Sequence, residues 1–303
     1  MIKSVSDLLN AAKTGETMTL VVAAAQDADV LYAVCKAAEE GLVKPILVGD
    51  AGAIQQIAKE QSLRIDSYEL LNEPDLVEAA RKSVKLVSDG VGDFLMKGLI
   101  DTSILLKAVL DKEIGLRTDR LLSHVMIYEV PHYHKLLFLT DGGMNIEPGF
   151  DEKVKITQNA IDACRAMGTQ VVKVAALAAK EKVNEKMLAT VDARKLQDLS
   201  REGYFGEGVI IEGPLAMDLA VSREAAQIKN FKSEIAGDTD VLVVPTIEVG
   251  NGIGKTLTYL AGAESAGVIM GAKVPVVLVS RADSYEAKLN SIALGSVIAA
   301  NSK

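Results

Sequence analysis

Glycine, asparagine and lysine are closely spaced between residues 245 and 256, and these residue types are well suited to binding an anion. The segment reads PTIEVGNGIGKT, with glycine at every second position from Gly250 to Gly254 and Lys255 directly after them. Apolar residues 241–244 predict a buried strand before it, and we expect a helix to begin near Lys255. Glycines allow close backbone approach to a ligand, and a helix N-terminus offers free N–H groups. The segment therefore predicts a site for a phosphorylated molecule.

The spacing matches neither of two well-known phosphate-binding motifs. A P-loop has the pattern G-x-x-x-x-G-K-[ST], and Gly254-Lys255-Thr256 supplies its end. The first glycine would have to stand at Val249, but Gly250 comes one residue later. The glycines also lack the G-x-G-x-x-G spacing of dinucleotide-binding folds. A flexible strand-to-helix turn without a ligand remains the alternative interpretation.

The composition limits the class of protein. The chain has 303 residues, of which 49% are hydrophobic and 4% aromatic, and its net charge is −8. This length predicts two domains or one large α/β unit. The negative charge argues against a general nucleic-acid binder, but it permits a local basic site for an acidic substrate. The N-terminus lacks an apolar segment of signal length and no stretch is long enough to span a membrane, so we expect a cytoplasmic protein.

Cysteine and histidine give no sign of a metal site. Cys35 and Cys164 lie far apart in helix-like segments, without a CxxC partner, so buried structural thiols are expected. A catalytic thiol would need an activating partner brought close by the fold. His132 and His134 form an H-x-H pair, but no carboxylate or cysteine stands at a helpful spacing. His124 lies on a predicted strand, as a core or a ligand-binding residue.

Strand-like and helix-like segments alternate along most of the chain. Repeated strand–helix units fold into a parallel, doubly wound α/β sheet with helices on both faces. The predicted strands are 18–25, 44–49, 63–70, 93–97, 121–129, 135–140, 170–175, 208–211, 241–244 and 274–279. The predicted helices are 28–40, 74–88, 102–110, 151–167, 184–202, 216–227, one beginning near 255, and 283–300. No helix separates 121–129 from 135–140, so we expect these two strands to be antiparallel.

A cluster of turn residues between 140 and 149 predicts a domain boundary near residue 143. Ligands of doubly wound sheets bind beyond the carboxyl ends of the strands. The candidate site residues therefore directly follow predicted strands: Lys97, Asp101, Thr102, Thr140, Asp141, Asn145, Glu212, Pro214, residues 245–255, Ser280 and Arg281.

Three segments together resemble the phosphate acyltransferase family. Residues 244–271 resemble its C-terminal signature, a P-D-x-x-x-G-N-x-x-[YG]-K loop followed by an L-A-G-A-E-A-x-G-P-I helix. A Ser-Arg pair ends the family's next strand, as Ser280-Arg281 does here. GEGVIIEGPLAMDLAVS is similar to the family's D-G-P-L-x-x-D-A-A segment, and LLFLTDGGMNIEP to its A-D-x-A-V-N-P turn. Three short segments are more similar in sequence to the phosphate butyryltransferases than to the phosphotransacetylases: SHVMIYEVP, TDGGMNI and SRADS.

The resemblance implies a reaction and an architecture. Acyl-coenzyme A and phosphate are interconverted with acyl phosphate and free coenzyme A. Coenzyme A and phosphate are therefore substrates, and the resemblance implies no cofactor or metal. It also implies a homodimer and two doubly wound α/β domains with an active-site cleft between them, as in isocitrate and isopropylmalate dehydrogenases. The first domain would comprise residues 1–143 plus 278–303 and the second 144–277. An acyl kinase, such as butyrate kinase, would be the partner enzyme.

The resemblance also assigns roles to residues. Arg281 would contact the phosphate or the acyl carbonyl oxygen, because its planar guanidinium suits phosphate and stays charged. Ser280 would hydrogen-bond the thiol of coenzyme A. Gly250, Asn251, Gly252 and Lys255 would line the phosphate side; further substrate-binding candidates are Thr246, Asp141, Asn145, Lys97, Thr102 and His124. For Lys97 and Thr102 the alternatives are a solvated lysine and a helix N-cap.

The family's general base has no counterpart in this sequence. That aspartate falls on Ala287, with Glu286 adjacent and Asp283 one helical turn earlier. Asp283 and Glu286 are therefore candidate bases, although together they also spell a capping box. Two alternatives to a phosphate acyltransferase stay open: an acyl-coenzyme A or acyl-phosphate binding protein without turnover, and a two-domain NAD-dependent decarboxylating dehydrogenase.

Overall fold

The computed structural model describes residues 1–279 and 283–302 of the chain, which form two compact units. The first, here called the N-terminal unit, comprises Val5–Arg120 and Ser265–Lys303, and the second, the central unit, comprises Met1–Ser4 and Leu121–Glu264. The division therefore follows residue 120, whereas the turn cluster predicts residue 143. The difference arises because the 140–149 turns connect a strand and a helix of the same unit.

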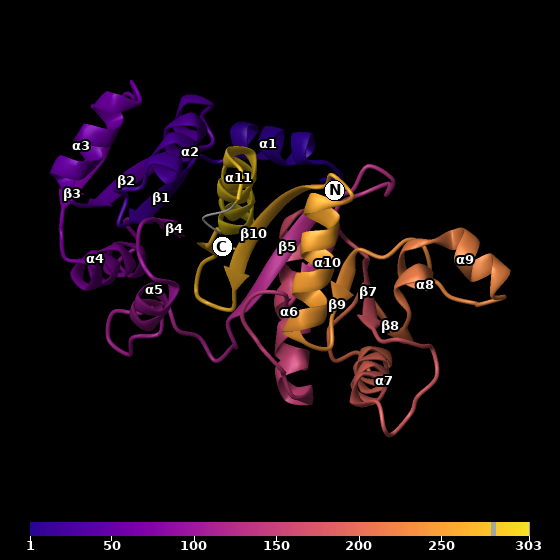
Figure 1. Ribbon diagram of the computed structural model, residues 1–303. Coiled ribbons are helices and arrows are strands. Elements are labelled where there is room, and N and C mark those ends of the chain that lie inside the picture. The colour runs from indigo at the N-terminus through magenta and orange to yellow at the C-terminus, as the bar shows by residue number, and fades with distance from the viewer. Residues whose placement is uncertain (280–282, 303) are drawn as a thin grey trace. The chain divides into compact units, whose positions relative to one another are not determined.

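The N-terminal unit is a mainly parallel α/β sheet. Its strands follow the order β3-β2-β1-β4-β11-β10, and β3, β2, β1, β4 and β11 run parallel. The strands are β1 (Met18–Ala23), β2 (Val43–Gly49), β3 (Glu69–Asn72), β4 (Phe94–Lys97), β10 (Glu264–Met270) and β11 (Val276–Val277). The helices are α1 (Val5–Thr14), α2 (Ala28–Glu39), α3 (Ala51–Glu60), α4 (Leu76–Ser88), α5 (Thr102–Val109) and α11 (Tyr285–Asn301). Figure 1 shows α11 beside α2 and α1, while α4 and α5 form a separate pair.

The central unit repeats this organisation. Its strand order is β5-β6-β9-β7-β8, with β6, β9, β7 and β8 parallel and β5 antiparallel to β6, as predicted. The strands are β5 (Ser123–Glu129), β6 (Leu137–Thr140), β7 (Val172–Leu177), β8 (Val209–Leu215) and β9 (Val241–Val243). The helices are α6 (Phe150–Ala166), α7 (Leu188–Arg201), α8 (Met217–Val221), α9 (Arg223–Ile228) and α10 (Ile247–Tyr259). The doubly wound α/β fold predicted from the alternating pattern is thus confirmed.

Local packing overrides the sequence pattern in the segment from 245 to 279. Helix α10 begins at Ile247, so the prediction that a helix begins near Lys255 is wrong. Residues 264–270 form a strand where the sequence pattern and the family resemblance predict helix. Gly262 has φ +65 and separates the two elements, and residues 266–270 of the strand are fully buried. The predicted strand 274–279 is reduced to Val276–Val277.

The single helix predicted for residues 216–227 is interrupted once in the structure. This stretch divides into α8 and α9, because Ser222 has an extended backbone conformation. The Ser222 side chain then accepts a hydrogen bond from the Ala225 backbone N–H and caps the second helix. A buried apolar cluster including Leu219, Ala226 and Ile235 lies beneath the two short helices.

Candidate functional site

Asp141 organises the turn that follows β6. Its carboxylate accepts four hydrogen bonds, from the backbone N–H groups of His124 (3.1 Å), Gly143 (2.9 Å) and Met144 (2.9 Å) and from Asn145 Nδ2 (2.6 Å). Only 3% of the Asp141 surface is exposed. Both carboxylate oxygens therefore accept hydrogen bonds within the fold, and these bonds fix the shape of the turn.

The turn is also tied to the beginning of β5. Asn145 Nδ2 donates a second hydrogen bond to the carbonyl oxygen of Leu122 at 3.0 Å, and Thr140 Oγ1 donates to the carbonyl oxygen of His124 at 2.9 Å. A Cβ atom at Gly143 would lie 2.5 Å from Nδ1 of His124, so the imidazole packs directly against the turn. The fold thus brings together three predicted site residues: Asp141, Asn145 and His124.

Helix α10 lies against the same turn through two glycines. A Cβ atom at Gly142 would come 2.8 Å from the Gly250 carbonyl carbon, and one at Gly250 would come 2.7 Å from Gly142 Cα. The side-chain amide of Asn251 donates to the Gly142 carbonyl oxygen at 3.4 Å. Glycine at both positions is therefore required for the close approach of two backbone segments. The turn and the beginning of α10 form the candidate site of the central unit.

The remaining residues of the glycine-rich segment have different positions on α10. Gly254 is buried, and a Cβ there would lie 2.5 Å from the Tyr128 hydroxyl, whereas Gly252 faces open space. Thr246 is the N-cap, without a side-chain capping bond. Lys255 is exposed, with its ammonium 5.6 Å from the ring centre of Tyr259. Lys255 lies eight residues, or about 12 Å, beyond the beginning of α10, so it is not at the helix N-terminus.

Lys97 and Thr102 lie at the carboxyl ends of the strands of the N-terminal unit. Lys97 is buried, and its ammonium donates to the carbonyl oxygens of Gly98 (3.1 Å) and Ile100 (3.0 Å). The alternative of a solvated lysine is therefore wrong. Thr102 is the first residue of α5, and Asp101 occupies the N-cap position, so the N-cap interpretation of Thr102 is also wrong.

The beginning of α11 differs from the predicted capping box. Ser284 is the N-cap, and its hydroxyl accepts from the Ala287 backbone N–H at 3.2 Å. The capping-box interpretation of Asp283 and Glu286 is therefore wrong, because the cap lies one residue later. Glu286 is exposed in the first turn. Ser280 and Arg281 lie outside the described residues, so their predicted roles remain predictions.

One buried charge at the beginning of α11 was missed. Lys288 is 3% exposed, and its ammonium donates to the carbonyl oxygen of Asp283 at 2.6 Å. The signal was present in the sequence, because residues 289–299 are almost entirely apolar or small, which is typical of a helix buried on all sides. A lysine at the beginning of such a helix must find its partners within the fold.

Both thiols are buried, and one imidazole contacts a carboxylate. Cys35 and Cys164 are both buried. Burial raises the pKa of the Cys35 thiol to about 11 and that of Cys164 to about 12, so neither is an activated nucleophile at neutral pH. His134 Nε2 lies 2.7 Å from an Asp238 carboxylate oxygen. Within residues 1–279 and 283–302, no cluster of three or more histidine, cysteine or carboxylate residues could hold a metal ion.

Comparison with known proteins identifies the family. The family model described as phosphate acetyl/butaryl transferase matches residues 4–81 and 73–296. The chain belongs to this family. It is 43% identical to phosphate butyryltransferase from Clostridium acetobutylicum, over 99% of this chain and 100% of that protein. It is 44% identical to phosphate butyryltransferase from Clostridium beijerinckii over the full length of both.

A solved structure agrees with this assignment. The crystal structure of a branched-chain phosphotransacylase from Enterococcus faecalis V583 matches with a TM-score of 0.84 and 34% sequence identity, over 93% of this chain and 99% of that chain. The resemblance of the three motif segments to the phosphate acyltransferases is thereby confirmed. Across the described residues, no helix of this family member is long and apolar enough to span a membrane.

Proposed function

We propose that this protein interconverts a short-chain acyl-coenzyme A and phosphate with acyl phosphate and free coenzyme A. One observation carries the proposal. Gly142 and Gly250 come from two motif segments more than 100 residues apart, and they pack so closely that a Cβ atom on either would collide with the other. The full-length relatives named phosphate butyryltransferase support the same reaction.

Catalysis would rest on positioning and electrostatic stabilisation. A phosphate oxygen attacks the thioester carbonyl carbon, the tetrahedral centre collapses, and the C–S bond breaks to release the coenzyme A thiolate. Arg281 would stabilise the oxyanion or the phosphate, and Ser280 would donate a hydrogen bond to the sulfur. The segments around Asn145 and Asn251 would form the phosphate side. Asp141 would hold this surface in place through its hydrogen bonds to the turn.

Proton transfer at the coenzyme A sulfur requires little help from a base. A free thiol has a pKa of about 8.5, not far above neutral pH, and a neighbouring guanidinium stabilises the thiolate. Ala287 offers no base at the position where the family has aspartate. Glu286 and Asp283 remain the candidate proton acceptors in the direction that consumes free coenzyme A.

Direct transfer between two bound substrates is favoured over an acyl-enzyme. Both cysteine thiols are buried with raised pKa values, so neither is a competent nucleophile. A decisive test is exchange of labelled coenzyme A into butyryl-coenzyme A in the absence of phosphate. Direct transfer predicts no exchange until phosphate is added. Rapid phosphate-independent exchange, with an acyl adduct in the intact mass of the protein, would establish an acyl-enzyme instead.

The finer parts of the proposal rest on the relatives. Their names favour butyryl or branched-chain acyl groups. A homodimer, a cytoplasmic location, activity without a metal or other cofactor, and an acyl kinase that consumes the product remain predictions. Acyl phosphate trapped as its hydroxamate by hydroxylamine would identify the product. If thiol is released without hydroxamate, the protein is a thioesterase and the proposal fails.

A further inference from the structure

A pocket of about 600 Å³ lies in the central unit, away from the candidate site. Lys173 is the second residue of β7 and Asp238 shortly precedes β9, so both stand at the amino ends of parallel strands. The candidate site residues Asp141 and Thr246 follow the carboxyl ends of β6 and β9. The pocket and the candidate site therefore lie at opposite ends of the parallel strands of the central unit.

The charged side chains that line the pocket are Lys173, Arg223 and Lys232, with the carboxylates Glu234 and Asp238. Asp238 receives Lys173 Nζ at 2.5 Å, His134 Nε2 at 2.7 Å and Lys135 Nζ at 3.2 Å. Burial alone would raise the pKa of Asp238, but these hydrogen bonds outweigh burial and hold its pKa well below the ordinary value. Arg223 Nη2 approaches Asp238 only to 3.7 Å, too far for a hydrogen bond. Its guanidinium can therefore donate to a bound anion.

The fold fixes the backbone from which Arg223 projects. A Cβ atom at Gly237 would collide with the backbone nitrogen and Cγ of Arg223, so the turn at Gly237 packs tightly on the beginning of α9. Gly237 has φ +67, and its N–H donates to the carbonyl oxygen of Leu219 at 3.0 Å. Ser222 caps the helix immediately before Arg223. These contacts hold the backbone of Arg223 in place at the beginning of α9.

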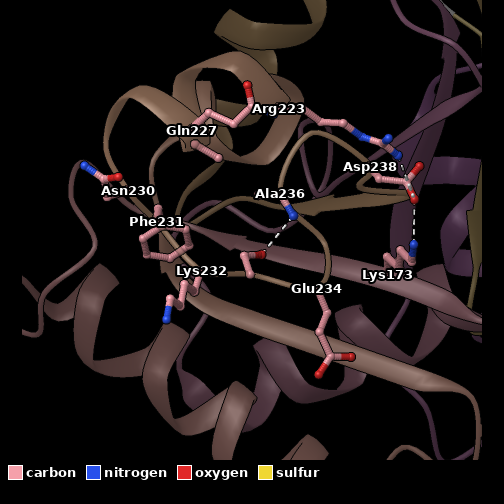
Figure 2. Close-up of a pocket in the computed structure, with 11 residues that line it drawn as sticks. Lys173, Arg223, Gln227, Asn230, Phe231, Lys232, Glu234, Ala236 and Asp238 are labelled. Atoms are coloured by element: carbon pink, nitrogen blue, oxygen red, sulfur yellow. Dashed lines mark hydrogen bonds and ion pairs between the residues drawn. The ribbon is translucent and has the colours of Figure 1, made fainter.

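An aromatic ring and two amides also line the pocket, next to Lys232 and Glu234. Phe231 is half-buried against the apolar cluster of the central unit, and the amides of Gln227 and Asn230 line the same wall. Figure 2 shows Phe231 and Asn230 across the pocket from Asp238 and Arg223. An aromatic ring stacks on a flat base, and amides hydrogen-bond to base edges. The volume lies within the range of small-molecule sites, about 300–1,000 Å³.

We propose that this pocket binds a nucleoside phosphate, with the phosphate on Arg223 and the base on Phe231. Guanidinium groups bind phosphate through paired charge-assisted hydrogen bonds. Free nucleotide and the nucleotide part of coenzyme A share this chemistry. Within the central unit, the pocket lies at the opposite ends of the parallel strands from the segments of Asn145 and Asn251, so its occupation is tested independently of their assigned role.

Calorimetric titration with AMP tests the site. AMP binds the wild-type protein, and Arg223→Met weakens binding about 10- to 100-fold because charge-assisted hydrogen bonds are lost. Phe231→Leu also weakens it, whereas Arg64→Met, which removes an 86% exposed arginine from the N-terminal unit, leaves it unchanged. Adenosine and inorganic phosphate each bind at least about tenfold more weakly than AMP, since each provides half of the contacts.

A parallel titration in saturating coenzyme A distinguishes the two sources of nucleotide. If the AMP affinity is unchanged in coenzyme A, the ligand is free nucleotide. If the AMP affinity is lost, the pocket binds the nucleotide part of coenzyme A. In both cases AMP binding to the protein without coenzyme A must weaken in Arg223→Met. AMP that binds Arg223→Met and wild-type protein equally well occupies another site, and the proposal is then wrong. Absence of AMP binding to the wild-type protein overturns it as well.

Discussion

Replacing Gly250 with alanine tests whether the turn at residues 141–145 and helix α10 must touch. The added Cβ would lie 2.7 Å from Gly142 Cα and 2.9 Å from the Asp141 carbonyl oxygen, and neither backbone atom can move without shifting the turn. Such overpacking costs about 1–3 kcal/mol. Alanine is about 1 kcal/mol more favourable than glycine inside a helix, so the net loss for Gly250→Ala is about 0–2 kcal/mol.

Gly252→Ala is the matched control on the same helix. Nothing lies within 4 Å of a Cβ at this position, so only the helix-propensity gain of about 1 kcal/mol applies. The propensity contributions cancel between the two variants, which leaves a difference of about 1–3 kcal/mol. This corresponds to about 2–4 °C in the melting temperature for each kcal/mol.

Both variants are compared by thermal unfolding and by phosphate-dependent release of coenzyme A. We expect Gly252→Ala to melt at or above the wild-type temperature, because its Cβ meets no other atom. Gly250→Ala should melt lower and lose up to about 100-fold in kcat/KM, because it displaces the turn that carries Asn145. Equal melting temperatures and equal activities for the two variants would refute the close contact between the turn and α10.

Three further changes test other parts of the account. Asp141→Asn replaces an acceptor oxygen with a donor among four converging hydrogen-bond donors, and it should lower the free energy of unfolding by about 2 kcal/mol or more in denaturant titrations. Arg281→Ala should lower turnover by several orders of magnitude, and near wild-type turnover would remove Arg281 from the mechanism. The lowered pKa of Asp238 stabilises the fold above the unfolded-state pKa of about 3.9, and this contribution disappears as the pH falls below that value. Asp238→Asn should therefore be less stable than wild type at pH 6, with a difference that shrinks below about pH 4; a constant difference would contradict the ion-pair account.

The sequence predicted the architecture well because, along most of the chain, the spacing of apolar residues agrees with the secondary structure that forms. Apolar runs such as 18–23 and 241–243 are strands buried between helices, and the absence of a helix between 129 and 137 predicted the antiparallel pair. In residues 245–270 local propensity and packing disagree. Glycines at 250, 252 and 254 resemble a loop, but two of them are required by helix contacts that only the folded chain creates.

Some site residues were predicted from the sequence and others were not, again because tertiary contacts decide what each side chain does. Residue types located Asp141 and Asn145, but they could not show that the Asp141 carboxylate would accept hydrogen bonds from three groups of its own turn and from the His124 backbone N–H. The position of Lys255 depended on where α10 begins, and that boundary was wrong by eight residues. Lys288 was missed because no motif marks it, although the apolar run that follows it indicates a buried helix.

The central claim is acyl transfer from coenzyme A to phosphate, and thiol release measures it most directly. Purified protein is given acetyl-, butyryl- or isobutyryl-coenzyme A, with and without phosphate, in chelator or in added magnesium. The account predicts release that requires phosphate, does not require metal and is faster with the four-carbon substrates. No release from any of the three by folded protein, or release only when magnesium is present, would contradict it.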